Sequence, residues 1–241
     1  MSRILNKLLG LDVALWLCLL LAGGSVALAF VGAENAGAFM GRAECQAGTL
    51  VLAVGLAVSG IRAIRRRRFD SALMHLGCAC VMSGWLVGQH ALRTTSAEHP
   101  ATGAMAMIDG DKMDTLWAGA RLDKPAGKLP FAVRLEKFTV EYYDQGPVRE
   151  YRSRITILEP DKEPRVENVR VNHPAYVHGY HIYQMSWGES ADRFGRPVVY
   201  TVLQFIRDPG LPVVYTGFVV LLVGTLWFAA RFFARPKGGA A

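Results

Sequence analysis

The chain has 241 residues, of which 51% are hydrophobic, and 27 Lys and Arg stand against 20 Asp and Glu. A mean hydropathy of +0.21 excludes an intrinsically disordered chain and a fibrous repeat. The apolar residues are concentrated in four runs of about 18 to 22 residues, the length that a helix needs to cross a bilayer. These features exclude a soluble enzyme and a free DNA-binding protein.

The four apolar runs predict four transmembrane helices, because a backbone surrounded by lipid must satisfy its own hydrogen bonds. They cover residues 11–32, 47–64, 71–92 and 212–233. The first run contains Ala27-Leu28-Ala29, which is typical of a signal-peptide cleavage site, so cleavage of this span is the alternative. The run is longer than the apolar core of ~7–15 residues that a signal peptide has, which favours a retained helix.

Basic residues fix the expected orientation, because cytoplasmic loops of membrane proteins are enriched in Lys and Arg. They precede the first span, fill segment 65–68 between the second and third spans, and follow the fourth. Both termini are therefore expected in the cytoplasm and residues 93–207 on the outer side. Residues 93–207 hold 16 basic and 15 acidic residues, so the basic excess reflects topology, and no nucleic-acid binding is expected.

The outer segment is expected to form a mainly antiparallel β domain, sandwich-like or an open barrel, between the third and fourth spans. Strands are predicted at 131–142, 151–158, 166–171, 179–187 and 198–206, because turns rather than helices separate them. The apolar alternation slips by one residue at Lys137, which predicts a β-bulge. The last strand is almost wholly apolar and is expected at the centre of the sheet, whereas the segment before 131 suggests one or two edge strands.

These elements divide the chain into three parts. Residues 1–92 hold three helices, residues 93–207 form the outer β domain, and residues 208–241 hold the fourth helix and a cytoplasmic tail.

No arrangement of side chains predicts catalysis by this chain alone. The four cysteines form no CxxC motif, which argues against a thiol–disulfide oxidoreductase. No Ser-His-Asp order, paired carboxylates or phosphate-binding glycine loop is evident. Three histidines fall within 173–181, but no acidic or cysteine partner has metal-ligand spacing, so no metal site is expected.

The most specific motif of the chain is VNHPAYVHGYHIYQMSWG at 171–188. It is similar to the signature V-N-x-P…Y-x-G-y-x-x-Y-Q-s of the ResB (CcsB-type) family of cytochrome c biogenesis proteins, known as system II. Segments that begin at Leu129, His75 and Asp208 are similar to the first outer strand, the start of the third span and the approach to the last span. The chain resembles a short member, and it has Ala175 where a leucine usually follows the signature proline.

The resemblance implies one half of a two-part system in the bacterial cytoplasmic membrane. ResB proteins work with a ResC/CcsA-type membrane protein that carries a tryptophan-rich haem-handling motif, and together they deliver haem to apocytochrome c. The five tryptophans of this chain are scattered, so it is similar to the ResB half alone. The resemblance therefore implies haem as a transient or shared cofactor. It implies as partners the ResC/CcsA-type protein, apocytochrome c and the lipid bilayer. It also implies an accessory subunit of a haem lyase rather than an enzyme in its own right.

Histidine is a natural axial ligand of haem iron, and the candidates in this chain are His75, His90 and His173. His75 and His90 lie fifteen residues apart on the third span, which corresponds to ~22 Å of rise and ~60° of rotation. They are expected near opposite membrane faces on roughly the same side of the helix. The alternative is that both are interfacial residues at helix ends.

His173 belongs to the signature, whose other residues are interpreted as fixing a turn and the strands around it. These residues are Asn172, Pro174, Gly179, Tyr183, Gln184 and Trp187. The aromatic residues of the segment are interpreted as core, with a groove for a porphyrin or an unfolded chain as the alternative.

The sequence allows two other functions. A b-type cytochrome subunit needs histidines that face each other from two helices, and only the third span has any, so a partner would have to supply ligands. The other is a haem-free, membrane-anchored scaffold for assembly outside the cytoplasm.

Overall fold

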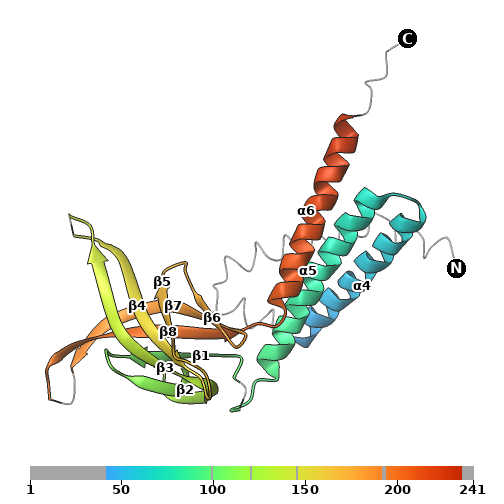
Figure 1. Ribbon diagram of the computed structural model, residues 1–241. Coiled ribbons are helices and arrows are strands. Elements are labelled where there is room, and N and C mark those ends of the chain that lie inside the picture. Colours follow the sequence, from blue (N-terminus) through green and yellow to red (C-terminus); the bar gives the residue numbers. More distant parts are fainter. Residues whose placement is uncertain (1–41, 99, 120, 145, 192–193, 235–241) are drawn as a thin grey trace, which may run out of the picture. The chain divides into compact units, whose positions relative to one another are not determined.

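The computed structural model describes residues 42–98, 100–119, 121–144, 146–191 and 194–234 (Figure 1). The predicted span 11–32 lies outside the described residues. The chain divides into two units, a helical unit and a β unit from His90 to Pro209, and each is described here by itself.

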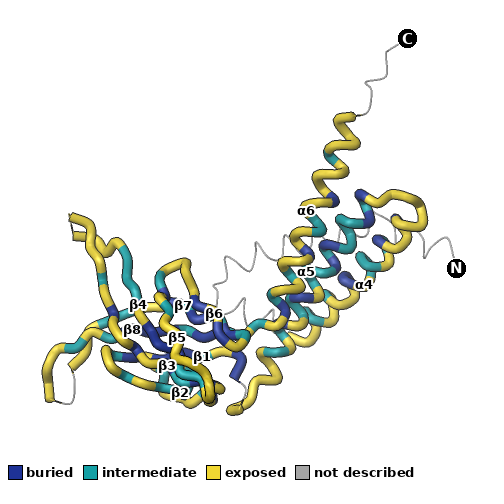
Figure 2. The backbone as a smooth tube through the Cα atoms, in the orientation of Figure 1, coloured by how far each residue is buried: buried dark blue, intermediate teal, exposed yellow. Residues whose placement is uncertain are grey.

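Three long helices are described: α4 (Ala43–Arg65), α5 (Phe69–Arg93) and α6 (Leu211–Phe233). Each is long and apolar enough to cross a membrane, which confirms the helices predicted at 47–64, 71–92 and 212–233. Most of their bulky apolar side chains are exposed, and this is most evident on α6 (Figure 2). Such a surface is suited to lipid, so the chain is a membrane protein.

Helices α5 and α6 are antiparallel and pack through glycines. A Cβ placed on Gly77 would lie 2.6 Å from the backbone nitrogen of Leu221, and one on Gly217 would lie 2.7 Å from the backbone nitrogen of Val81. No side chain fits at such distances, so glycine permits this close approach of the two backbones. In a membrane this kind of packing replaces the hydrophobic effect as the force between helices.

The β unit is one eight-stranded sheet in which every pair is antiparallel. Its order is β5-β4-β3-β2-β1-β8-β7-β6. The strands are β1 (Thr102–Met107), β2 (Lys112–Ala118), β3 (Lys124–Tyr142), β4 (Val148–Leu158), β5 (Arg165–Arg170), β6 (Ala175–Val177), β7 (Tyr180–Ala191) and β8 (Pro197–Arg207).

The two edges of this sheet meet, because β5 and β6 are joined by a two-residue turn. Arg170 and His173 exchange backbone hydrogen bonds of 3.2 and 3.0 Å across that turn. Buried hydrogen bonds also connect β4 with β7 and β8, although β4 and β7 are each the second strand from an edge. The sheet therefore curls into one open barrel. The expected sandwich-like domain is wrong in so far as a sandwich consists of two sheets, because this unit has one.

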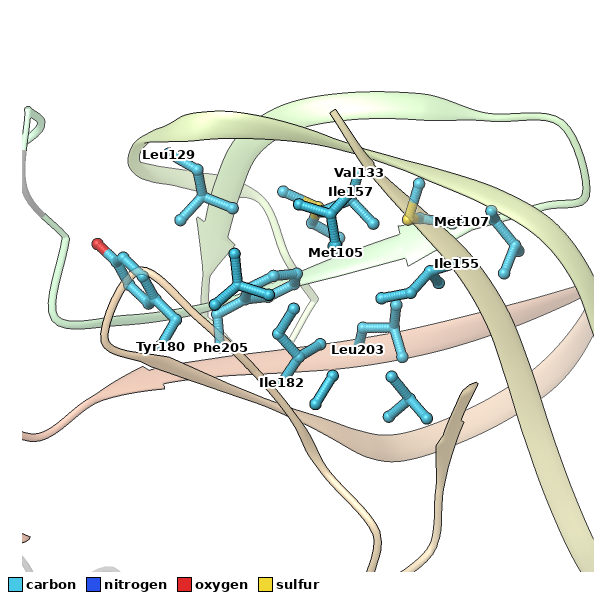
Figure 3. Close-up of a cluster of buried hydrophobic side chains, with 14 of the residues drawn as sticks. Met105, Met107, Leu129, Val133, Ile155, Ile157, Tyr180, Ile182, Leu203 and Phe205 are labelled. Atoms are coloured by element: carbon cyan, nitrogen blue, oxygen red, sulfur yellow. The ribbon is translucent and has the colours of Figure 1, made fainter. Parts of the chain in front are cut away.

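The core fills the inside of the curl (Figure 3). Its fully buried side chains include Met105, Leu135, Ile155, Ile182 and Phe205. The predicted bulge is confirmed, since the β3–β4 register shifts between Leu135 and Lys137. The central position of the last strand is also confirmed, because β8 pairs with β1 and β7.

The expectation that the segment before 131 supplies edge strands is wrong. Strands β1 and β2 lie in the middle of the sheet, and the edges are β5 and the three-residue β6. The physical reason is that the outward residues of β1 include Ala104 and Ala106, which give a weak apolar–polar alternation.

Candidate functional site

His75 is half-buried on α5, in the second turn of the helix. Its Nδ1 lies 2.6 Å from the carbonyl oxygen of Ser71 and 3.4 Å from the Ser71 hydroxyl. The carbonyl oxygen can only accept, so the proton is on Nδ1. In the neutral ring the lone pair is then on Nε2, which is the arrangement of a histidine prepared to bind a metal.

His90 lies in the last turn of α5 and is exposed. Its backbone carbonyl accepts a hydrogen bond of 3.0 Å from the hydroxyl of Thr94, which helps to end the helix. The structure thus places both predicted histidines on one helix and orients the ring of His75.

The signature begins with the tight turn between β5 and β6. Asn172 has a φ of 61°, in the left-handed region that asparagine tolerates better than most residues. Pro174 lies two residues further on and directly precedes β6. Asn172 lies within the turn that Arg170 and His173 close by backbone hydrogen bonds. The side chain of His173 is exposed beside this turn.

The turn that contains His173 lies near the carboxylate of Glu150. The hydrogen bond from Arg152 lowers the pKa of Glu150 below its ordinary value, and the charges of Arg170 and His173 act in the same direction. This part of the outer surface is therefore a mixed cluster of acidic and basic side chains.

The next turn joins β6 to β7 and contains only His178 and Gly179. Their φ angles are 49° and 81°, and Val177 pairs with Tyr180 on either side of them. Two central residues with positive φ define a type I′ hairpin, the turn that matches the twist of the strands. Gly179 is therefore needed for backbone conformation.

His178 ties this hairpin to two other parts of the β unit. Its ring stacks on Phe131 with centroids 5.7 Å apart, and its Nε2 lies 2.5 Å from a carboxylate oxygen of Glu159. The hydrogen bond from Lys162, followed by that from His178, holds the pKa of Glu159 below its ordinary value.

Gln184 and Trp187 belong to the interior. Gln184 accepts a hydrogen bond of 2.6 Å from Ser153 and donates one of 2.6 Å to Thr201, and all three residues are buried. Trp187 packs against Phe138 with ring centroids 6.2 Å apart. Both signature residues hold distant strands together, and nothing in the sequence identifies Ser153 or Thr201 as the partners.

The outer face of β6 and β7 carries an aromatic group that sequence reasoning missed. His181 lies between Tyr176 and Tyr183, with ring centroids 5.0 and 6.0 Å away. Tyr176 is 60% exposed, so its assignment to the core is wrong. Tyr183 is half-buried on this same outer face, whereas Tyr180 is buried inside. Successive side chains of a strand point to opposite faces of the sheet. Because Ile182 is buried, this alternation would have placed His181 and Tyr183 together on the outer face.

Comparisons with known proteins point in one direction. The model of the ResB-like family matches residues 64–196, more than half of the chain. Cytochrome c biogenesis protein CcsB of Synechococcus sp. (strain WH7803) is 27% identical over 143 residues, which cover 51% of this chain and 33% of that protein. The chloroplastic cytochrome c biogenesis protein CCS1 of Oryza sativa subsp. japonica is 29% identical over 132 residues, 52% of this chain and 21% of that protein.

Protein NrfI of Wolinella succinogenes is 30% identical over 102 residues, 41% of this chain. The match covers 10% of NrfI, so in each of these three relatives the chain corresponds to a third of the length or less.

Proposed function

Since the chain belongs to the ResB-like family, we propose that it is a membrane component of c-type cytochrome biogenesis that assists the delivery of haem to apocytochrome c. The observation that carries this proposal is the family match, which extends from the end of α4 through α5 and most of the β unit. Relatives that share about half of this chain are named for cytochrome c biogenesis. The three apolar helices fit a function at a membrane.

His75 is the residue that we assign to haem within the helices. Ionisable residues inside a membrane are costly and are more often functional than structural. The bond from Nδ1 to the Ser71 carbonyl leaves Nε2 as the atom that would bind iron. His90 and His173 are exposed and would be secondary positions on the way to the outer side.

A partner would complete the haem site. Neither α4 nor α6 contains a histidine, so a second axial ligand from a facing helix has no source in these two elements. A ResC/CcsA-type protein with its own histidines and tryptophan-rich motif would supply that ligand. This also distinguishes the proposal from a self-contained b-type cytochrome.

The proposed setting is the bacterial cytoplasmic membrane, with the β unit outside. Because α5 and α6 are antiparallel, the start of α5 and the end of α6 lie at one end of the pair. Arg65–Arg68 and Arg231 are at that end, which the positive-inside rule assigns to the cytoplasm. The chain leaves α5 and returns to α6 at the other end, where apocytochrome c would receive haem.

The test is complementation of a strain that lacks this gene, with c-type cytochromes measured by haem staining. We expect the full chain to restore cytochromes, and His75→Ala to lower both their yield and the haem that co-purifies with the complex. Ser71→Ala is the matched control, because it keeps the backbone carbonyl that orients the ring. Full cytochrome yield in the deletion strain would refute the function. Full yield with His75→Ala at normal protein level would refute only the role of His75.

A further inference from the structure

The outside of the barrel has two unlike halves. Exposed residues on β3 and β4 are mostly charged, among them Arg134, Lys137 and Arg154. The face formed by β2, β1, β8 and β7 instead surrounds a hollow of about 1090 Å³. Among the described residues that line it, only Asp111 and Arg121 are charged. A solvated sheet face would carry polar and charged side chains throughout.

The hollow results from small side chains flanked by large ones. Its floor includes Ala104 and Ala106 of β1. Across the sheet, Ala104 pairs with Trp117 of β2 and with Gln204 of β8. Tyr200 of β8 also lines the hollow and crosses over β7, since a Cβ on Gly188 would lie 2.6 Å from its hydroxyl. Aromatic side chains therefore border a floor of small side chains.

A β-bulge adds Met185 to this border. The β7–β8 register shifts between Gln184 and Ser186, so Met185 is the additional residue, and it is 55% exposed. Gln184 donates to the carbonyl of Ser186 at 3.2 Å as well as to Thr201, so the buried hydrogen bonds fix the bulge from inside. Bulges of this kind commonly direct a side chain toward a site. The methionine sulfur is polarisable and adapts its shape to apolar ligands.

One basic side chain, Arg121, and one acidic side chain, Asp111, line the hollow. The carboxylate of Asp111 accepts a hydrogen bond of 2.8 Å from the backbone of Ile108 and so serves the β1–β2 turn. Arg121, after β2, is exposed and makes no ion pair or hydrogen bond with the parts of the chain that the structure describes. A guanidinium in this position suits a carboxylate, which it can bind through two hydrogen bonds.

We propose that this hollow binds a flat, largely apolar ligand with carboxylates at one edge, which is the chemistry of a tetrapyrrole. The ring system would lie on the alanine floor between Trp117, Tyr200 and Met185, with its carboxylates at Arg121. The volume of about 1090 Å³ is slightly above the ~300–1,000 Å³ that small-molecule sites occupy. The proposal rests on the proposed function, in which haem passes this unit, and it adds a binding site that needs no bond to iron.

The experiment uses the full chain in detergent micelles and metal-free protoporphyrin IX as the probe. Without iron, ligation by histidine contributes nothing, and fluorescence anisotropy of the porphyrin reports binding. Ala106→Trp places an indole on the exposed floor and is expected to weaken binding at least tenfold. Thr139→Trp, at an exposed position on β3, is the matched control and should bind normally. If Ala106→Trp unfolds the β unit, Trp117→Leu should weaken binding instead.

The dimethyl ester of protoporphyrin IX tests the assigned charge. Arg121→Gln should weaken binding of the free acid by about tenfold and leave binding of the ester unchanged. Arg154→Gln is the control for a general change in charge.

Three results would overturn the proposal. The first is equal porphyrin affinity of Ala106→Trp and Thr139→Trp in folded proteins. The second is an effect of Arg121→Gln that is the same for acid and ester. The third is loss of cytochrome assembly in Ala106→Trp with porphyrin affinity unchanged, which would assign the hollow to a polypeptide. None of them removes the proposed function, which fails only if the gene deletion leaves cytochrome yield intact.

Discussion

The guanidinium of Arg231 lies 3.1 Å from the carboxylate of Asp70, and so connects the last turn of α6 to the first turn of α5. The Asp70 side chain is only 10% exposed, whereas that of Arg231 is 50% exposed. The other carboxylate oxygen of Asp70 is buried and has no hydrogen-bond partner among the described residues. Asp70 therefore depends on Arg231 for compensation of its charge.

We predict that Arg231→Met destabilises the protein, because it leaves a buried carboxylate unpaired. Loss of one partner of a fully buried pair costs about 3–5 kcal/mol, and the exposure of Arg231 reduces the expected cost to about 1–3 kcal/mol. The double variant with Asp70→Asn should recover part of this loss. Thermal unfolding in detergent measures both, and equal stability of the single and double variants would show that the pair is unimportant.

Substitution of a helical glycine by leucine should lower the yield of folded protein on α6 and leave it unchanged on α4. Gly217→Leu forces a side chain against the backbone of α5 and is expected to separate the two helices, with a several-fold lower yield of folded protein. Gly55→Leu is the control, because a Cβ at that position would meet no described atom within 4 Å apart from the nearby backbone of its own helix and its chain neighbours. Yield in membranes and resistance to heating in detergent are the measurements. Similar behaviour of the two variants would contradict glycine-mediated packing.

Gln184→Leu should destabilise the β unit by about 1–3 kcal/mol, because two buried hydroxyls lose a partner. Gln184→Glu should be more damaging at pH 7 than at pH 5, since burial favours the neutral form of a carboxyl group. The unfolding temperature at the two pH values tests this. Gln204→Leu, on the outer face of β8, is expected to change it little. A pH-independent Gln184→Glu protein would mean that the triad is open to water.

The contacts of Glu159 predict a pH dependence at the β6–β7 hairpin. Hydrogen bonds from Lys162 and then His178 hold the pKa of Glu159 in the folded protein below its ordinary value of 4.5. A lowered pKa means that the carboxylate stabilises the fold above that ordinary value, and that this stabilisation disappears as the pH falls through the lowered pKa. The unfolding temperatures of the native protein and Glu159→Gln should therefore converge in acid.

The control for this prediction is Glu163→Gln, which changes an exposed neighbour. Its unfolding temperature should follow that of the native protein at every pH. A difference between the native protein and Glu159→Gln that persists below the lowered pKa would show that the carboxylate acts through packing rather than through charge.

Much of the secondary structure could be predicted, because each element is decided by its own side chains. Apolar length defines α4, α5 and α6, and period two with a slip at Lys137 defines β3. The curl of the sheet could not be predicted, since it depends on contacts between distant residues. Ser153 and Gln184 are 31 positions apart, and their pairing has no local pattern.

Some features of the candidate site could likewise be predicted from the sequence, and others could not. The turns at Asn172 and Gly179 have a signal in the sequence, because a left-handed backbone conformation favours these two residue types. The orientation of the His75 ring needed coordinates, and so did the hollow, whose floor and border come from four strands. Small residues such as Ala104 leave no signal in the sequence, yet they create the concavity.

The meeting of β5 and β6 has a consequence for how the protein behaves among its neighbours. An unpaired sheet edge is a template onto which other chains can add a strand and aggregate. Here the edge strands have six and three residues, and the turn at Asn172 bonds each edge to the other. A partner that delivers or receives unfolded polypeptide would therefore find little edge to extend, and it would have to recognise this unit through its faces.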